Sequence, residues 1–305
     1  VNPIPAAITG ANTLCVGSTT ALSDATPGGT WASSNTGVAS IGSLLGVVSG
    51  VTAGTATITY RLGTGCNVTF AMTVNPTPVA ITGINTVCAG STTVLSDATA
   101  GGTWSSGTTG VATIGASTGI VTGVAAGTSS ITYAIGTCIA ARTVSVNPVP
   151  ATITGTTTLC VGNSTTLSDA TAGGTWSSSN TGVATIGSAT GVVNAVSAGT
   201  SNISYTLSTG CRTTAVFTVN GLPAAITGTA AVCVGATTTL SNATSGGAWT
   251  SGTPAVATVG SSTGIVSGVT AGTSVVTYTT GAGCFVTRTV TVNANPSSIT
   301  PAGAI

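Results

Sequence analysis

The sequence contains no histidine, no lysine and no glutamate, and charged residues make up only 2% of its 305 residues. An ordinary globular protein carries about 25% charged residues. Four arginines and three aspartates leave a formal net charge of +1. This charge is too small to attract a nucleic-acid backbone or an acidic membrane surface. We therefore expect no nucleic-acid partner.

The missing side chains also remove most routes to catalysis. A nucleophilic serine needs a neighbouring base, and the chain offers neither histidine nor lysine for that role. At most one carboxylate side chain per repeat falls short of the roughly six to eight oxygen ligands that calcium takes. The sequence therefore predicts no enzyme, no catalytic residue, no cofactor and no metal site.

Long apolar runs are also missing, because serine, threonine or glycine interrupts the apolar residues every few positions. A spanning helix needs about 18 or more consecutive apolar residues, so no membrane-spanning segment is expected. The chain begins at Val1 without an initiator methionine or a signal-peptide pattern. We interpret it as a mature product or a piece of a longer chain.

What the sequence does contain is a fourfold repeat. The phrase VNPIPAAITG at Val1 returns, slightly altered, at Val74, Val146 and Val219, and a fifth opening, VNANPSSITP, begins at Val292. Such self-similarity is typical of repeat architectures. The expected domains are repeat 1 at 1–73, repeat 2 at 74–145, repeat 3 at 146–218 and repeat 4 at 219–291, followed at 292–305 by the start of a fifth repeat or a linker.

Short alternating segments of valine, isoleucine and threonine fill each repeat, separated by turns of glycine, serine, threonine and asparagine. A spacing of two favours strands over helices. About seven or eight short strands in each repeat predict an all-β chain of sandwich domains. In the third repeat we expect strands near 149–155, 157–161, 164–169, 174–179, 183–187, 191–197, 201–207 and 211–219.

Two cysteines per repeat point to disulfides, because the chain has no histidine to complete a zinc site. Pairing within each repeat uses all eight, whereas a Cys66–Cys88 bond across a junction would leave Cys15 and Cys284 without partners. The within-repeat scheme is favoured. It predicts Cys15–Cys66, Cys88–Cys138, Cys160–Cys211 and Cys233–Cys284. Persistent disulfides indicate an extracellular or cell-surface protein.

The third repeat carries the stretch GTWSSSNTGVATIGSATGVVNAVSAGTSNISYTLS, which resembles the bacterial immunoglobulin-like group-two domain. The other three repeats carry the same pattern. The phrase TLCVGSTT resembles tandem repeats of very large secreted surface proteins of Bacteroidetes-type bacteria. The resemblance implies immunoglobulin-like β-sandwiches in a rod, of the kind found in adhesins, stalks and accessory modules. It departs from antibody-type domains in its cysteines, which are expected to join the A/B region to the F–G hairpin near one end of each sandwich.

Two further side chains recur at fixed places. One tryptophan follows each first cysteine by 16 residues and is expected to fill the core rather than bind sugars: Trp31, Trp104, Trp176 and Trp249. An aspartate or asparagine stands in each LS(D/N)AT phrase. We interpret it as a turn residue whose side chain accepts a backbone N–H, because asparagine serves there as well as aspartate: Asp24, Asp97, Asp169 and Asn242.

Native sheet edges normally carry charged side chains that prevent pairing with other copies. This chain has almost no charged residues to serve that purpose. Either surface glycans or neighbouring copies should therefore cover this chain. We expect an extracellular structural protein that forms a stalk, fibre or filament and associates with itself as a homopolymer. The alternative is the stalk of an adhesin whose binding head lies outside this chain.

Overall fold

The computed structural model describes residues 3–296. Over this range the chain forms strands and turns but no helix, so the described part holds no helix able to cross a membrane. The chain divides into two compact units, residues 1–149 and 150–305. Each unit contains two separate hydrophobic cores, one per repeat. The predicted fold class, all-β with tandem immunoglobulin-like sandwiches, is confirmed.

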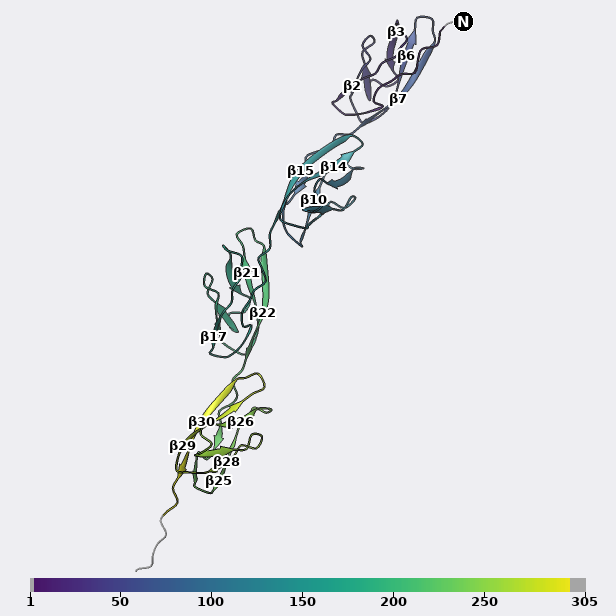
Figure 1. The fold of residues 1–305 in the computed structure, drawn as a ribbon. Helices are drawn as coiled ribbons and strands as arrows, with labels where there is room; N and C mark the ends of the chain where they lie inside the picture. Colours follow the sequence, from purple (N-terminus) through teal and green to yellow (C-terminus); the bar gives the residue numbers. More distant parts are fainter. Residues whose placement is uncertain (1–2, 297–305) are drawn as a thin grey trace, which may run out of the picture. The chain divides into compact units, whose positions relative to one another are not determined.

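The first unit contains the strands of the first two repeats (Figure 1). Those of the first are β1 (Thr13–Cys15), β2 (Thr19–Ala21), β3 (Gly29–Ser33), β4 (Ala39–Ile41), β5 (Val47–Gly50), β6 (Gly54–Leu62) and β7 (Asn67–Asn75). Those of the second are β8 (Thr82–Gly83), β9 (Thr86–Cys88), β10 (Thr92–Ser96), β11 (Thr103–Ser106), β12 (Ala112–Ile114), β13 (Ile120–Gly123), β14 (Gly127–Ile135) and β15 (Cys138–Asn147).

The second unit repeats the pattern. The third repeat holds β16 (Thr158–Cys160), β17 (Ser164–Thr166), β18 (Thr175–Ser178), β19 (Ala184–Ile186), β20 (Val192–Ala195), β21 (Gly199–Thr206) and β22 (Arg212–Asn220). The fourth holds β23 (Thr227–Gly228), β24 (Ala231–Cys233), β25 (Thr237–Ser241), β26 (Ala248–Ser251), β27 (Ala257–Val259), β28 (Ile265–Gly268), β29 (Gly272–Thr279) and β30 (Phe285–Asn293).

Each repeat consists of two sheets. In the first repeat the larger sheet has the order β1-β7-β6-β3 and the smaller β2-β5-β4. The short strand β1 runs parallel to β7, whereas all other pairs in this repeat are antiparallel. The other repeats keep this order, and the second and fourth add the two-residue strands β8 and β23 to their smaller sheets. The parallel pairing places each first cysteine beside the last residue of the repeat's last strand.

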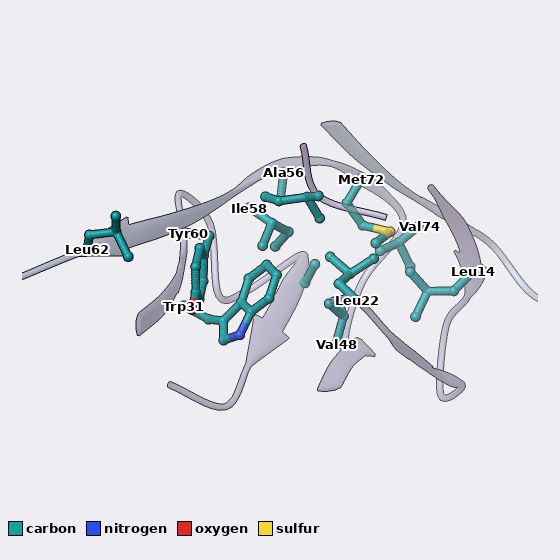
Figure 2. Close-up of a cluster of buried hydrophobic side chains, with 12 residues drawn as sticks. Leu14, Leu22, Trp31, Val48, Ala56, Ile58, Tyr60, Leu62, Met72 and Val74 are labelled. Atoms are coloured by element: carbon teal, nitrogen blue, oxygen red, sulfur yellow. The ribbon is translucent and has the colours of Figure 1, made fainter. Parts of the chain in front are cut away.

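The core of each repeat follows from the two-residue period of its longest strands. Along β6 the side chains of Ala56, Ile58, Tyr60 and Leu62 are buried, while those between them are more exposed. Successive side chains of a strand point to opposite faces, so one face of the sheet packs inward. Figure 2 shows these residues of the first core, with the Trp31 and Tyr60 rings side by side.

The segment expected as the first strand of the third repeat, 149–155, is only an isolated bridge between Thr154 and Ser168. Pro148 and Pro150 flank its start. Proline has no N–H to donate to a ladder and is confined to strand edges and ends. The segment therefore crosses from the preceding repeat with little regular pairing.

Candidate functional site: disulfide-linked junctions between repeats

The two cysteines of a repeat lie at opposite ends of its last strand. In the first repeat Cys15 pairs with Asn75, the last residue of β7, whereas Cys66 directly precedes the first residue of β7. Nine positions separate Cys66 from Asn75, which at about 3.3 Å per residue spans roughly 30 Å. A disulfide requires Cα atoms only about 4.4–6.8 Å apart. Pairing within a repeat is therefore impossible in this fold.

The observed disulfides instead cross from one repeat to the next. Cys15 bonds to Cys138, and Cys160 bonds to Cys284, each with a Cα–Cα distance of 5.6 Å. All four predicted within-repeat pairs are wrong, and so is the expectation that a bridge closes one end of each sandwich. Cys88 and Cys211 are also disulfide-bonded. Cys66 and Cys233 are free thiols, which rules out the alternative Cys66–Cys88 bond as well.

The first junction brings the end of β7 against the turn between β14 and β15. The Asn75 carbonyl accepts a hydrogen bond from Val16 N at 3.0 Å, and Cys138 Sγ lies 3.9 Å from the same oxygen. A Cβ on Gly136 would lie only 2.4 Å from Asn75 Nδ2. The turn therefore packs directly on the exit of the preceding repeat, and Cys138 is only 2% exposed.

The second junction repeats the contacts to the exit carbonyl in the second unit, where Val161 N donates to Asn220 O at 3.0 Å. Cys284 Sγ lies 3.9 Å from the Asn220 carbonyl oxygen, and Cys284 has no exposed surface. A cavity of about 220 Å³ borders this disulfide, and its lining contains no charged side chain: Cys160, Val161, Gly162, Asn163, Leu222, Gly283 and Phe285. Such a lining offers packing surface but no acid or base.

Away from the junctions, one polar network recurs in every repeat. In the third, Asp169 Oδ1 accepts a hydrogen bond from Thr171 N at 2.8 Å. The Tyr205 hydroxyl donates to Thr171 O at 2.8 Å and accepts from Gly174 N at 2.9 Å. The Trp176 and Tyr205 ring centroids lie 4.7 Å apart. A Cβ on Gly174 would lie 2.6 Å from the tyrosine ring, so this position requires glycine.

The predicted tryptophans and turn residues both belong to this network. It also contains a residue type that the sequence analysis does not single out. The four tryptophans are buried, and each aspartate or asparagine side chain accepts the backbone N–H two residues on. The additional residues are the tyrosines. Each follows its tryptophan by 29 residues, a regularity visible in the sequence: Tyr60, Tyr133, Tyr205 and Tyr278.

The fourth repeat has asparagine at the turn position where the other three repeats have aspartate. Asn242 Nδ2 donates to the Ala224 carbonyl at 2.5 Å, whereas Oδ2 of each corresponding aspartate is buried without a hydrogen-bond partner. Asp169→Asn should therefore raise the free energy of unfolding of the third repeat by about 1–3 kcal/mol, because an unsatisfied buried oxygen becomes a donor. Calorimetry on the full chain measures this.

The reverse substitution provides the matched control. Asn242→Asp removes the donor and should lower the stability of the fourth repeat by a similar amount. Added calcium should leave both melting profiles unchanged, because the described residues contain no group of three or more metal-ligating side chains. A calcium-dependent rise in melting temperature would contradict the turn assignment.

Comparisons with known proteins find only remotely similar solved structures. No protein-family model matches the sequence, and no curated protein matches it significantly. Domains 1–6 of the surface layer protein SbsC align at 16% identity and a TM-score of 0.23 over 97% of this chain, which spans only 55% of that one. Drosophila N-cadherin EC1-4 aligns at 10% identity and a TM-score of 0.24, covering 90% of this chain and 94% of that one. Invasin, a bacterial integrin-binding protein, aligns at 15% identity and a TM-score of 0.33, covering 94% and 79%.

Proposed function

We propose that this protein is an extracellular structural protein, a stalk or filament built from repeats of the bacterial immunoglobulin-like kind. The observation that carries the proposal is the direction of the disulfides, which join consecutive repeats. Domains of one chain normally move relative to each other unless a large interface holds them. Here a second covalent connection accompanies the linker, so bending and stretching of the junction are both restrained. A mechanical role in a stalk or filament depends on this restraint of the junction.

The disulfides also support a location outside the cytoplasm. Disulfides persist in secreted and cell-surface proteins and are rare where cytosolic reductants keep thiols reduced. Each sandwich is about the size at which burial of apolar surface alone gives marginal stability. Covalent reinforcement of such small domains is useful only where the bonds survive. This supports a secreted or cell-surface protein.

A structural role, rather than an enzymatic one, is supported by the chemistry of the described surface. The junction cavity in the described residues is lined by no titratable acid or base, because its cysteine is disulfide-bonded. The only acidic side chains, on Asp24, Asp97 and Asp169, each belong to a turn in a different repeat. Acid–base catalysis needs positioned proton donors and acceptors that act together. The described residues bring none together.

Self-association is part of the proposal and is supported by a recurring apolar surface. Aliphatic side chains at two equivalent positions of every repeat are exposed although they lie in or next to the smaller sheet: Val47, Val51, Ile120, Val124, Val192, Val196, Ile265 and Val269. A contact that is weak at one repeat is multiplied when the same surface recurs along a chain. Contacts of this kind between identical chains need not close, and open assemblies grow as fibres.

The assembly is expected to be insensitive to salt, because hardly any charge is present to be screened. Negative-stain images of native material, taken at low and at high ionic strength, should show the same ordered filaments. Filaments that dissolve on adding salt would contradict the apolar contact. Isolated flexible strings at high protein concentration would favour the stalk of an adhesin instead.

A further inference from the structure

The free thiol of Cys233 occupies the same place in its repeat as two cysteines that are disulfide-bonded. Cys233 ends β24 and pairs with Asn293 in β30. Cys15 and Cys160 end β1 and β16 in the same register. Both of these form disulfides with the following repeat. Cys233 is therefore placed to supply the first cysteine of another junction of the same kind.

The backbone around Cys233 already has the geometry of an occupied junction. Val234 N donates to Asn293 O at 3.0 Å, as Val16 N does to Asn75 O at 3.0 Å. Ala236 N donates to Cys233 O at 3.0 Å, closing the same turn that follows the bonded first cysteines. This end needs no rearrangement to accept a partner sulfur, and its thiol is exposed.

Cys66 is the second cysteine of the first repeat and is placed to supply the other side of such a junction. Its carbonyl accepts a hydrogen bond from Leu62 N at 2.9 Å, and in the fourth repeat the Cys284 carbonyl accepts from Thr280 N at 2.9 Å. The two hairpin ends therefore share one backbone geometry. They differ in burial: Cys284 is fully buried against the neighbouring repeat, whereas Cys66 is partly exposed.

We propose that Cys66 and Cys233 each form a further inter-repeat disulfide of the kind that joins Cys15 to Cys138. Each bonds to the complementary cysteine of one further repeat of this kind, so Cys233 takes a second cysteine and Cys66 takes a first. That repeat belongs either to a second copy of this chain or to an additional repeat in the same polypeptide. The inference goes beyond the proposed structural role because it assigns a directed covalent link to each end of the repeat array.

The bond forms by thiol–disulfide exchange with a small-molecule disulfide such as oxidised glutathione. One cysteine thiolate attacks the small disulfide, forms a mixed disulfide and releases one small thiolate. The second cysteine thiolate then attacks the protein sulfur of that mixed disulfide and releases the other. The protons lost by the two cysteines pass to the released thiolates, and the small disulfide is reduced by two electrons overall.

The first experiment tests whether a second copy is the partner. Cys66→Ser leaves only the Cys233 end free, and Cys233→Ser leaves only the Cys66 end free. The two full-length variants, one of them isotope-labelled, are mixed in a glutathione redox buffer and analysed by non-reducing gel and peptide mass spectrometry. We expect mixed dimers joined through Cys66 and Cys233 to exceed either homodimer by about tenfold. A first cysteine and a second cysteine can meet with disulfide geometry, so the pairing does not follow the thiolate fractions of the two cysteines alone.

The second experiment tests an additional repeat in the same polypeptide. Residues 292–305 are replaced by a copy of 74–147, so that Thr291 precedes the new repeat as Thr73 precedes Val74 and the copy keeps the whole of β15. In the copy the counterpart of Cys88 is changed to serine and that of Cys138 is kept. Alkylation of Cys233 by a maleimide should be lost in oxidising buffer and return after reduction, while Cys66 stays reactive.

The two experiments together decide the proposal. Selective mixed dimers identify a second copy as a partner, and protection of Cys233 in the extended chain identifies a repeat of the same polypeptide. Statistical dimer formation together with an unprotected Cys233 overturns the proposal. Filaments that persist when both thiols are replaced would leave the proposed structural role intact, so the two ideas fail separately.

Discussion

Replacing Trp176 by alanine is expected to lower the free energy of unfolding of the third repeat by about 3–5 kcal/mol. The ring is buried, pairs across the sheet with Tyr205, and lies against the left-handed turn at Gly191. Its removal leaves a cavity and also ends an aromatic contact worth about 0.5–1.5 kcal/mol. Calorimetry measures the loss, and hydrogen exchange of the β18 and β21 amides assigns it to the third repeat.

Val216→Ala is the matched control for this prediction. Val216 lies in β22 of the same repeat but is 61% exposed, so its truncation should change stability by no more than about 0.5 kcal/mol. Unchanged exchange in the Trp176→Ala variant would show that the ring does not support the core.

Removing the first junction disulfide by the double substitution Cys15→Ala and Cys138→Ala should have the other large effect. The two cysteines are 123 positions apart, and on the chain-entropy model a closed loop of this length contributes about 4–5 kcal/mol. The two repeats of the first unit should also lose their coupling. Calorimetry should then resolve two transitions at lower temperature in place of one joint transition.

Cys66→Ala is the control for the double substitution, because Cys66 is a free thiol in the same unit. Its removal should shift the melting temperature of the first unit little. A double variant that melts like the parent chain would contradict a mechanical role for the junction. It would also weaken the proposed function, which rests on that covalent link.

The sequence by itself determined the repeat and the kind of domain. The strand period of residues such as Ala56, Ile58 and Tyr60 predicts a sheet with one buried face, and the structure buries that face. These features are local. A two-residue alternation, a turn phrase and a fixed tryptophan position each act within a few residues, so one chain read from end to end reveals them.

The tyrosine network shows an intermediate case. Tyr205 follows Trp176 by the same 29 residues as in every other repeat, and this regularity could have identified it. Its hydroxyl, however, bonds to Thr171 and Gly174 on a distant turn. Only the folded sandwich brings these groups within hydrogen-bond distance.

The disulfide pairing was decided by tertiary structure alone. The parallel pairing of β1 with β7 places Cys15 at the exit of its repeat, and the hairpin before β7 places Cys66 at the opposite end. The nearest cysteine in space therefore belongs to the next repeat, although Cys66 is nearer in the sequence. The number of residues between two cysteines does not show at which end of the folded repeat each of them lies. Strand direction decides it, because a disulfide forms only where two Cα atoms lie within about 7 Å.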